Sequence, residues 1–227
     1  MEERVEYEFL LPYQFEHRMQ QCPLVYIPVG SLEWHGEHLA LGNDTIKIHT
    51  ICCEAARQGG GIVFPPIYFG IPFMVDYGKK YMYNANLPFS DVFLTTLLFS
   101  TLERLEHAGF KAAILITGHT PDEQCALIRK IAGTYTGQIR VYGTDDMSWA
   151  KELDYTSDHA AKWETSILWY IRPDLVDIYR LPKDIKQDLE GVYGDDPRKF
   201  ADKELGKKAV EVIIKDLVNL GWQLLHD

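Results

Sequence analysis

The sequence contains few cysteines, and their spacing does not suggest a disulfide framework. Four of the 227 residues are cysteines, which is too few for disulfide bonds to stabilise a chain of this length. None of them belongs to a Cys-x-x-Cys pair, so a zinc site made of thiolates is not predicted. Cys52 and Cys53 lie in an apolar, helix-like pattern, and we expect them to pack as small hydrophobic side chains.

Positive charge and long apolar runs are also scarce. The 23 lysines and arginines are outnumbered by 33 aspartates and glutamates, which gives a formal net charge of −10. A nucleic-acid-binding protein needs a basic surface to displace phosphate counterions, so no nucleic-acid partner is expected. The longest uncharged stretch, 58–75, is interrupted by Pro65, Pro66 and Pro72. No membrane span is therefore predicted.

No secretory leader or linker is recognisable. The chain begins with Met1-Glu2-Glu3-Arg4, which lacks the basic start and apolar core of a signal peptide, so we expect a cytoplasmic protein. There is no internal repeat, low-complexity segment or linker rich in serine and proline. A length of 227 residues, 46% of them hydrophobic and 25% charged, predicts a single globular domain over 1–227.

What the sequence does contain is an alternation of short apolar runs with longer helical patterns. Predicted strands cover 24–29, 62–64, 112–117 and a segment near 139–142. Predicted helices cover about 45–57, 91–109, 121–135, 160–171 and 200–220. Apolar strands that alternate with helices are typical of a mostly parallel sheet covered on both faces. We predict an α/β fold, a three-layer sandwich with a mostly parallel β-sheet flanked by helices.

Ligands of such sheets bind where the strands end at their carboxyl side, which directs attention to 30–44. Glu33 and His35 are two residues apart, so in extended backbone their side chains point to the same side. A carboxylate and an imidazole that project together form half of a metal site; a surface ion pair is the alternative. Asp44 follows Gly42-Asn43 and opens a helix, so it is a further ligand or a helix N-cap.

The second such segment is 117–123, which contains Gly118-His119 directly after a very apolar strand. On its own, His119 would more often be structural. Together with the three residues of the first segment, it adds a further nitrogen ligand at the same edge of the sheet. Carboxylate oxygens and imidazole nitrogens without thiolates favour Zn²⁺, Mn²⁺ or Fe²⁺.

A third segment, 158–166, contains His159 and Glu164, which are five residues apart. On a helix this spacing separates two side chains by about 140°, so one can lead into the site while the other supports it. A histidine beside a metal-activated water is a candidate proton shuttle. The alternative is an amphipathic surface helix with an incidental histidine.

Together these segments resemble a known family, the creatininase (creatinine amidohydrolase) family. Its signature is similar to the run Gly30-Ser31-Leu32-Glu33-Trp34-His35-Gly36-Glu37-His38-Leu39-Ala40-Leu41-Gly42-Asn43-Asp44. Further motifs follow in the family's order: Pro65-Pro66-Ile67-Tyr68-Phe69-Gly70, Gly109-Phe110, Gly118-His119, 159–166 and Gly191-Val192-Tyr193-Gly194-Asp195. The resemblance covers about 24–220.

The resemblance implies a site with two divalent metal ions bridged by an aspartate. It implies that Glu33, Asp44 and His119 hold one ion and that His35 and Asp44 hold the other. His159 matches the family's catalytic histidine, and Glu164 matches the carboxylate that accompanies it. The resemblance also implies a small-molecule amide substrate and a homo-oligomer, a hexamer in the family.

The sequence departs from the family pattern after His119. Pro121 stands where creatininase itself has a further carboxylate ligand, and a proline side chain cannot bind a metal. Thr120-Pro121-Asp122-Glu123 has the form of a helix capping box, which would engage Glu123 and leave Asp122 as the substitute ligand. We expect the second ion to be bound more weakly, through water, or by Glu164. Creatinine itself is therefore a poor candidate substrate.

The chemistry that such a site suits is hydrolysis of an amide or cyclic amide. A divalent ion lowers the pKa of water from about 15.7 to about 7 and polarises the scissile carbonyl, and His159 would protonate the leaving nitrogen. Two alternatives use the same residues: a non-catalytic, metal-stabilised binding or assembly protein, and a metal-dependent isomerase or lyase. Aromatic residues in 67–90 are candidates for a substrate wall or a subunit interface: Tyr68, Phe69, Phe73, Tyr77, Tyr81 and Tyr83.

Overall fold

The centre of the protein is a parallel sheet. The computed structural model describes residues 3–73, 80, 83–86, 90–149 and 153–226. Its strands, in the order β2-β1-β3-β4, are β1 Leu24–Val29, β2 Ile62–Val63, β3 Ala112–Thr117 and β4 Arg140–Asp145. Val29 pairs with Thr117, and Thr117 pairs with Asp145. The carboxyl ends of β1, β3 and β4 therefore lie side by side.

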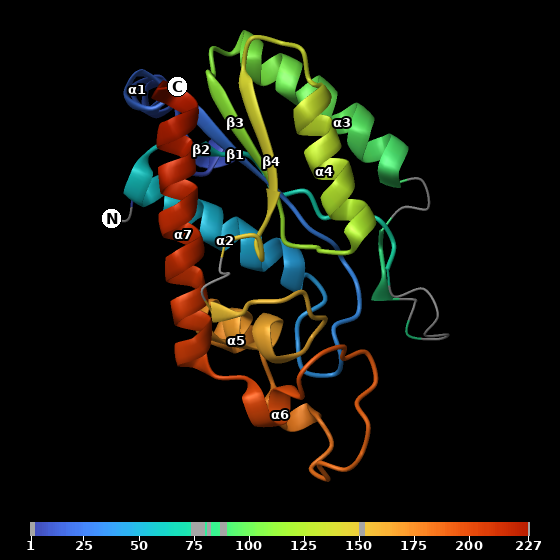
Figure 1. Ribbon diagram of the computed structural model, residues 1–227. Coiled ribbons are helices and arrows are strands. Elements are labelled where there is room, and N and C mark those ends of the chain that lie inside the picture. Colours follow the sequence, from blue (N-terminus) through green and yellow to red (C-terminus); the bar gives the residue numbers. More distant parts are fainter. Residues whose placement is uncertain (1–2, 74–79, 81–82, 87–89, 150–152, 227) are drawn as a thin grey trace.

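Helices cover both faces of this sheet (Figure 1). One face carries α2 (Asn43–Gly59), α5 (Lys162–Ile171) and α7 (Lys203–His226); the other carries α3 (Ser90–His107) and α4 (Asp122–Thr134). Successive strand residues point to opposite faces, so Leu24 and Tyr26 belong to the first core while Val25 and Ile27 belong to the second. The predicted three-layer α/β sandwich is confirmed.

The predicted elements agree with the structure more closely at the strands than at the helix ends. The strands predicted at 24–29 and 112–117 have those bounds, and the one near 139–142 continues to Asp145. The last predicted helix extends to His226. Elements that the sequence pattern did not indicate are α1 (Pro12–Gln21), α6 (Pro197–Phe200) and the short 3-10 helices Tyr7–Phe9, Pro173–Leu175 and Ile178–Arg180.

The predicted capping box at the start of α4 is wrong. The helix begins at Asp122, with Pro121 as its N-cap, and no side chain makes a capping hydrogen bond there. The helix thus starts one residue later than a box formed by Thr120 and Glu123 requires. The Thr120 hydroxyl instead lies 3.0 Å from the hydroxyl of Ser157, and Glu123 is exposed.

None of the helices in the described part of the chain combines the length and the apolar character that a membrane crossing requires.

Two glycines provide a matched test of how closely the helices pack. A Cβ at Gly206 on α7 would overlap the backbone carbonyl of Ser166 on α5, whereas a Cβ at the exposed Gly133 on α4 would meet no described atom within 4 Å. We expect Gly206→Ala to destabilise the fold by about 1–3 kcal/mol, because α7 must move away from α5. Gly133→Ala should stabilise it by up to about 1 kcal/mol. Urea unfolding measures both changes, and equal shifts would contradict this account.

Candidate metal centre

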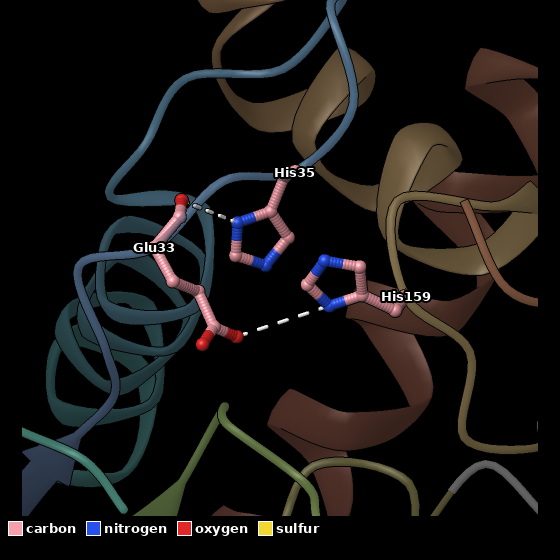
Figure 2. Close-up of side chains that lie close together, drawn as sticks. All are labelled: Glu33, His35 and His159. Carbon is pink, nitrogen blue, oxygen red and sulfur yellow. Dashed lines mark hydrogen bonds and ion pairs between the residues drawn. The ribbon is translucent and has the colours of Figure 1, made fainter. Parts of the chain in front are cut away.

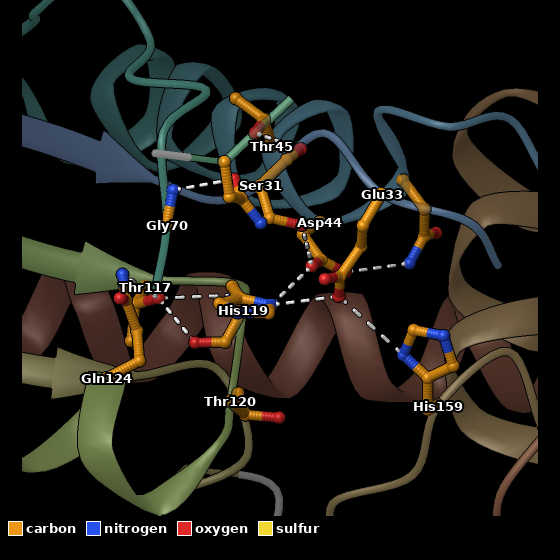
Figure 3. Close-up of polar contacts among 12 residues, drawn as sticks. Ser31, Glu33, Asp44, Thr45, Gly70, Thr117, His119, Thr120, Gln124 and His159 are labelled. Carbon is orange, nitrogen blue, oxygen red and sulfur yellow. Dashed lines mark hydrogen bonds and ion pairs between the residues drawn. The ribbon is translucent and has the colours of Figure 1, made fainter. Parts of the chain in front are cut away.

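The loop after β1 supplies the first two candidate ligands. It is closed by a hydrogen bond of 3.0 Å from the Glu33 backbone N–H to the carbonyl of Leu41. The side chains of Glu33 and His35 are fully buried, so the alternative of a surface ion pair is wrong. The carboxylate of Glu33 points toward Asp44 and His119, which come from α2 and from the end of β3 (Figure 3).

Asp44 lies in the first turn of α2 and is not its N-cap, which is Gly42. Its carboxylate instead joins two histidines from different strand ends. Oδ1 lies 2.9 Å from Nε2 of His35, and Oδ2 lies 2.9 Å from Nδ1 of His119. The Ser31 hydroxyl donates to Oδ2 at 2.7 Å. Asp44 is therefore the residue at which the loops after β1 and β3 meet.

A glycine makes this meeting possible. A Cβ at Gly118 would overlap the backbone carbonyl of Asp44. Any side chain at position 118 would therefore push the first turn of α2 away from the end of β3, and would separate Asp44 from His119. The sequence Gly118-His119 thus provides both the close approach and the ligand.

Each of the three candidate histidines is anchored by a backbone carbonyl. The contacts are His35 Nδ1 to Glu33 O (3.0 Å), His119 Nε2 to Ile71 O (2.8 Å) and His159 Nε2 to Trp34 O (2.8 Å). A carbonyl oxygen only accepts hydrogen bonds, so the anchored nitrogen carries the hydrogen. The other nitrogen of each ring faces carboxylate oxygens, as Figure 2 shows for His159 and Figure 3 for His119. In metal sites, such an anchor fixes the tautomer and the orientation of a ligating histidine.

This arrangement needs a proton or a cation between the facing atoms, because a bare ring nitrogen and a carboxylate oxygen both present lone pairs. Oε1 of Glu33 is buried and has no hydrogen-bond partner among the described residues. In the same part of the chain, three sets of side chains bring ligand atoms within 4.8 Å of one another: Glu33/Asp44/His119, His35/Asp44/Glu164 and Glu33/His35/His159. These oxygen and nitrogen donors fit a divalent metal ion.

The pKa values of the clustered side chains also indicate that this site requires positive charge. Burial lowers the pKa of His35, but the carboxylates of Asp44 and Glu164 outweigh burial and raise that pKa to about 9. Burial is likewise outweighed at His119, where Glu33 and Asp44 raise the pKa well above its usual value. Burial alone would raise the pKa of Asp44, yet the two histidines hold it well below its usual range. Protons on His35 and His119 supply the charge when no metal ion is bound.

His159 is electrostatically different from these two histidines. Its ring stacks on that of His35 with the centroids 4.3 Å apart. Burial and the neighbouring His35 lower the pKa of His159 to about 4, so it is neutral at pH 7. Its Nδ1 lies 3.8 Å from Oε1 of Glu33 (Figure 2). His159 therefore presents a free lone pair beside the candidate ligands.

A cavity of about 130 Å³ opens onto the cluster and is lined in part by Asp44, His159 and Glu164. From the predicted aromatic wall, Phe73 also lines it, with its ring 5.6 Å from that of His159. Phe69 instead packs edge-on against Phe93 at 6.0 Å. Two further members of that prediction, Tyr77 and Tyr81, lie outside the described residues.

The structure does not bring Asp122 to the cluster. Asp122 is exposed at the start of α4 and belongs to none of the three ligand sets found among the described residues. Pro121 lines the cavity without offering a ligand atom. The carboxylate that lies beside His35 and Asp44 is Glu164.

Sequence reasoning missed two buried charged residues behind the cluster, Lys47 and Asp146. Nζ of Lys47 lies 3.2 Å from Oε1 of Glu164 and 2.9 Å from Oδ2 of Asp146. Two signals were available in the sequence. Lys47 follows Asp44 by three residues and so shares a helix face with it. Asp146 directly follows β4, at the same sheet edge as the other strand-end ligands.

Comparisons with known proteins identify the family of the chain. The sequence profile of the Creatininase family, described as creatinine amidohydrolase, matches residues 12–220. The chain belongs to this family.

Three curated relatives are hydrolases by name. A 3-dehydro-scyllo-inosose hydrolase of Thermotoga maritima is 30% identical over 51% of this chain and 36% of its own length. A creatinine amidohydrolase of Pseudomonas putida is 23% identical over 70% of this chain and 68% of its own. A mycofactocin precursor peptide peptidase of Mycolicibacterium smegmatis is 25% identical over 67% and 59%. The matches thus span only part of these relatives.

Solved structures share the fold along the whole chain. A crystal structure of creatininase has a TM-score of 0.79 at 19% identity and covers 99% of both chains. A putative creatinine amidohydrolase from Bacteroides fragilis has a TM-score of 0.80 at 20% identity, covering 100% of this chain and 98% of the other. At these identities the likeness establishes the fold, not the substrate.

Metal binding should stabilise the protein more at high pH than at low pH. The pKa of His35 is about 9 in the folded protein and about 6.5 in an unfolded chain, so its proton stabilises the fold below about pH 6.5 and is lost as the pH rises through about 9. A metal ion must displace that proton. We expect a larger rise in Tm on adding Zn²⁺ at about pH 8.5 than at about pH 6. Equal rises would contradict the assignment of His35 as a ligand.

Proposed function

We propose that this protein is a divalent-metal-dependent amidohydrolase that cleaves an amide or cyclic amide C–N bond of a small molecule with an activated water. The observation that carries the proposal is the Asp44 carboxylate, whose two oxygens each lie 2.9 Å from the inward nitrogen of a carbonyl-anchored histidine. A carboxylate in this position is suited to bridge two cations. Membership of the creatininase family and the hydrolase names of the relatives support the same class.

The ligand sets support two ions. Glu33, Asp44 and His119 would hold one ion, and His35 and Asp44 would hold the other. Solved creatininases include a Zn–Zn form of a variant and a manganese form, and the oxygen and nitrogen donors here suit zinc, manganese or iron. When bound, such an ion lowers the pKa of water to about 7 and polarises a substrate carbonyl.

His159 is suited to move the proton in this reaction. Because burial lowers the pKa of His159, Nδ1 starts without a proton and first acts as an acceptor. The Trp34 carbonyl keeps the Nε2 hydrogen in place, so the proton taken up must reside on Nδ1. Glu33, 3.8 Å from Nδ1, stabilises the resulting imidazolium. The same proton can then pass to the leaving nitrogen.

The cavity supports a small-molecule substrate. Its volume of about 130 Å³ is several times the roughly 10–15 Å³ that one water molecule needs on the same measure. None of the described residues that line it is a lysine or an arginine, so the bound metal ions would supply the positive charge that a polar group of the substrate meets there. An amide or lactam carbonyl is suited to this environment.

Replacing Asp44 should remove the metal centre. We expect Asp44→Ala to retain less than one metal ion per chain and to lose activity by more than about 100-fold on a panel of amides and lactams, because both ligand sets share this carboxylate. Metal content is measured by elemental analysis after dialysis. Asp122→Ala, which removes an exposed carboxylate, is the control and should keep both properties. Unchanged metal content and stability in Asp44→Ala would exclude the metallohydrolase.

Replacing His159 should separate metal binding from turnover. We expect His159→Gln to keep its metal, since neither of the two proposed ions needs this residue, and to lose about 10²–10⁴-fold in kcat, as for removal of an acid–base group.

His38 provides a matched control for this experiment. It is also a buried histidine, with its pKa lowered to about 4 by burial and by His35, but it contacts Thr165 at 2.9 Å and is not among the cavity-lining residues. His38→Gln should change kcat only slightly. If His159→Gln loses metal instead, His159 is a ligand; if it keeps full turnover, His159 takes no part in the reaction.

The remaining expectations about the whole protein stay predictions. A cytoplasmic location, a single domain over 1–227 and a homo-oligomer, hexameric by family resemblance, are compatible with the proposed activity. Exposed aromatic side chains such as Tyr179 and Trp222, 87% and 62% exposed, are candidates for a subunit contact. A mass measurement in solution tests the oligomer.

A further inference from the structure

The ammonium group of Lys47 is buried in the protein interior, where lysine side chains are rare. Its side chain is 1% exposed, and it lies on α2 three residues after Asp44, directly behind the metal centre. A buried ammonium is very costly unless it is paired on all sides. Its two partners are Glu164, at 3.2 Å, and Asp146, at 2.9 Å. The pairing therefore links the end of β4 to the first turn of α5.

Asp146 fixes the far side of Lys47. It is fully buried, and its Oδ2 also accepts a hydrogen bond of 3.1 Å from the Tyr155 hydroxyl. Two partners from different segments thus hold this carboxylate, so Lys47 cannot follow Glu164 if that side chain moves. Lys47 is an anchor for Glu164 rather than a mobile counter-ion.

The two carboxylate oxygens of Glu164 have different partners, one on the side of Lys47 and one on the side of the metal centre. Oε1 takes the contact with Lys47. Oε2 accepts a hydrogen bond of 2.7 Å from the Ala160 N–H and lies 3.6 Å from Nε2 of His35. Asp158 fixes the start of α5 by accepting from the N–H groups of Trp163 and Glu164 at 2.6 and 3.2 Å. The orientation of Glu164 is therefore set before any ligand binds.

We propose that Glu164 completes a second cation site with His35 and Asp44, and that Lys47 is the positioning residue that holds Glu164 there. This inference rests on the proposed function, because it concerns the second of the two ions. One nitrogen and two carboxylate donors suit Zn²⁺, Mn²⁺ or Fe²⁺. The charge of Lys47 offsets that of Asp146, which leaves three carboxylates, those of Glu33, Asp44 and Glu164, to face two divalent ions.

Metal stoichiometry tests the role of Glu164 independently of activity. We expect two Zn²⁺ per chain in the wild type after equilibrium dialysis and one in Glu164→Gln, whose amide oxygen still accepts from Lys47 or the Ala160 N–H but carries no charge. Asp122→Asn, with an exposed carboxylate replaced, should keep two. If Glu164→Gln fails to fold, Glu164→Asp takes its place and should bind the second ion at least about 10-fold more weakly.

The role of Lys47 is tested by the affinity of each ion separately. We expect Lys47→Met to weaken the second Zn²⁺ by about 10–100-fold, as for loss of an outer-shell partner, and to leave the first unchanged. Lys208→Met, with an exposed lysine on α7 replaced, is the control. A purely structural Lys47 would lower the Tm but leave both affinities as in the wild type, and that result would overturn its positioning role.

Failure of this inference can be distinguished from failure of the proposed function. Any of three results would overturn the Glu164 site. These are two Zn²⁺ bound by Glu164→Gln with the affinity of the wild type, a single Zn²⁺ bound by the wild type, and loss of an ion in Asp122→Asn. None of these results would exclude the ion held by Glu33, Asp44 and His119, so the proposed amidohydrolase function would still stand. Only unchanged metal content and stability in Asp44→Ala, which would exclude the metallohydrolase, overturns both proposals.

Discussion

The contact of one carboxylate with two histidines organises this protein. Asp44 lies 2.9 Å from both His35 and His119, and so joins the first turn of α2 to the loops that follow β1 and β3. These loops could bury their polar side chains only in each other's presence, because an unpaired charge in the interior costs several kcal/mol. The sheet register brings the strand ends to one level, and the glycine before His119 lets α2 approach. Asp44 then determines which side chains meet.

The sequence was sufficient to predict the parts of this arrangement that depend on local rules. Apolar runs located β1 and β3 at their observed bounds, and the rule that ligands gather at carboxyl strand ends pointed to Glu33, His35 and His119. Their burial and contacts could not be read locally. The burial of Glu33 and His35 excludes a surface ion pair between them, and Gly42 takes the N-cap position that Asp44 could have held.

The parts that could not be predicted depend on contacts between distant segments. Lys47 was not singled out from the sequence, because its burial depends on two carboxylates from distant segments, Asp146 and Glu164. Asp122 was predicted to be the substitute ligand because a capping box at the start of α4 would have engaged Glu123. The helix that begins there leaves its side chain exposed. Glu123 is exposed as well, and the carboxylate beside His35 and Asp44 comes instead from Glu164 on α5.

Protons and metal ions compete for the same positions in this centre, and that competition connects stability with function. Protonated His35 and His119 neutralise the buried carboxylates and hold the fold together in the absence of metal. A bound metal ion would take the place of these protons, held by the same carboxylate oxygens and ring nitrogens. His159 escapes the competition because burial and the positive charge of the adjacent His35 lower its pKa to about 4 and keep it neutral. The cluster thereby contains two histidines whose pKa values are raised and a third that is neutral and can accept a proton.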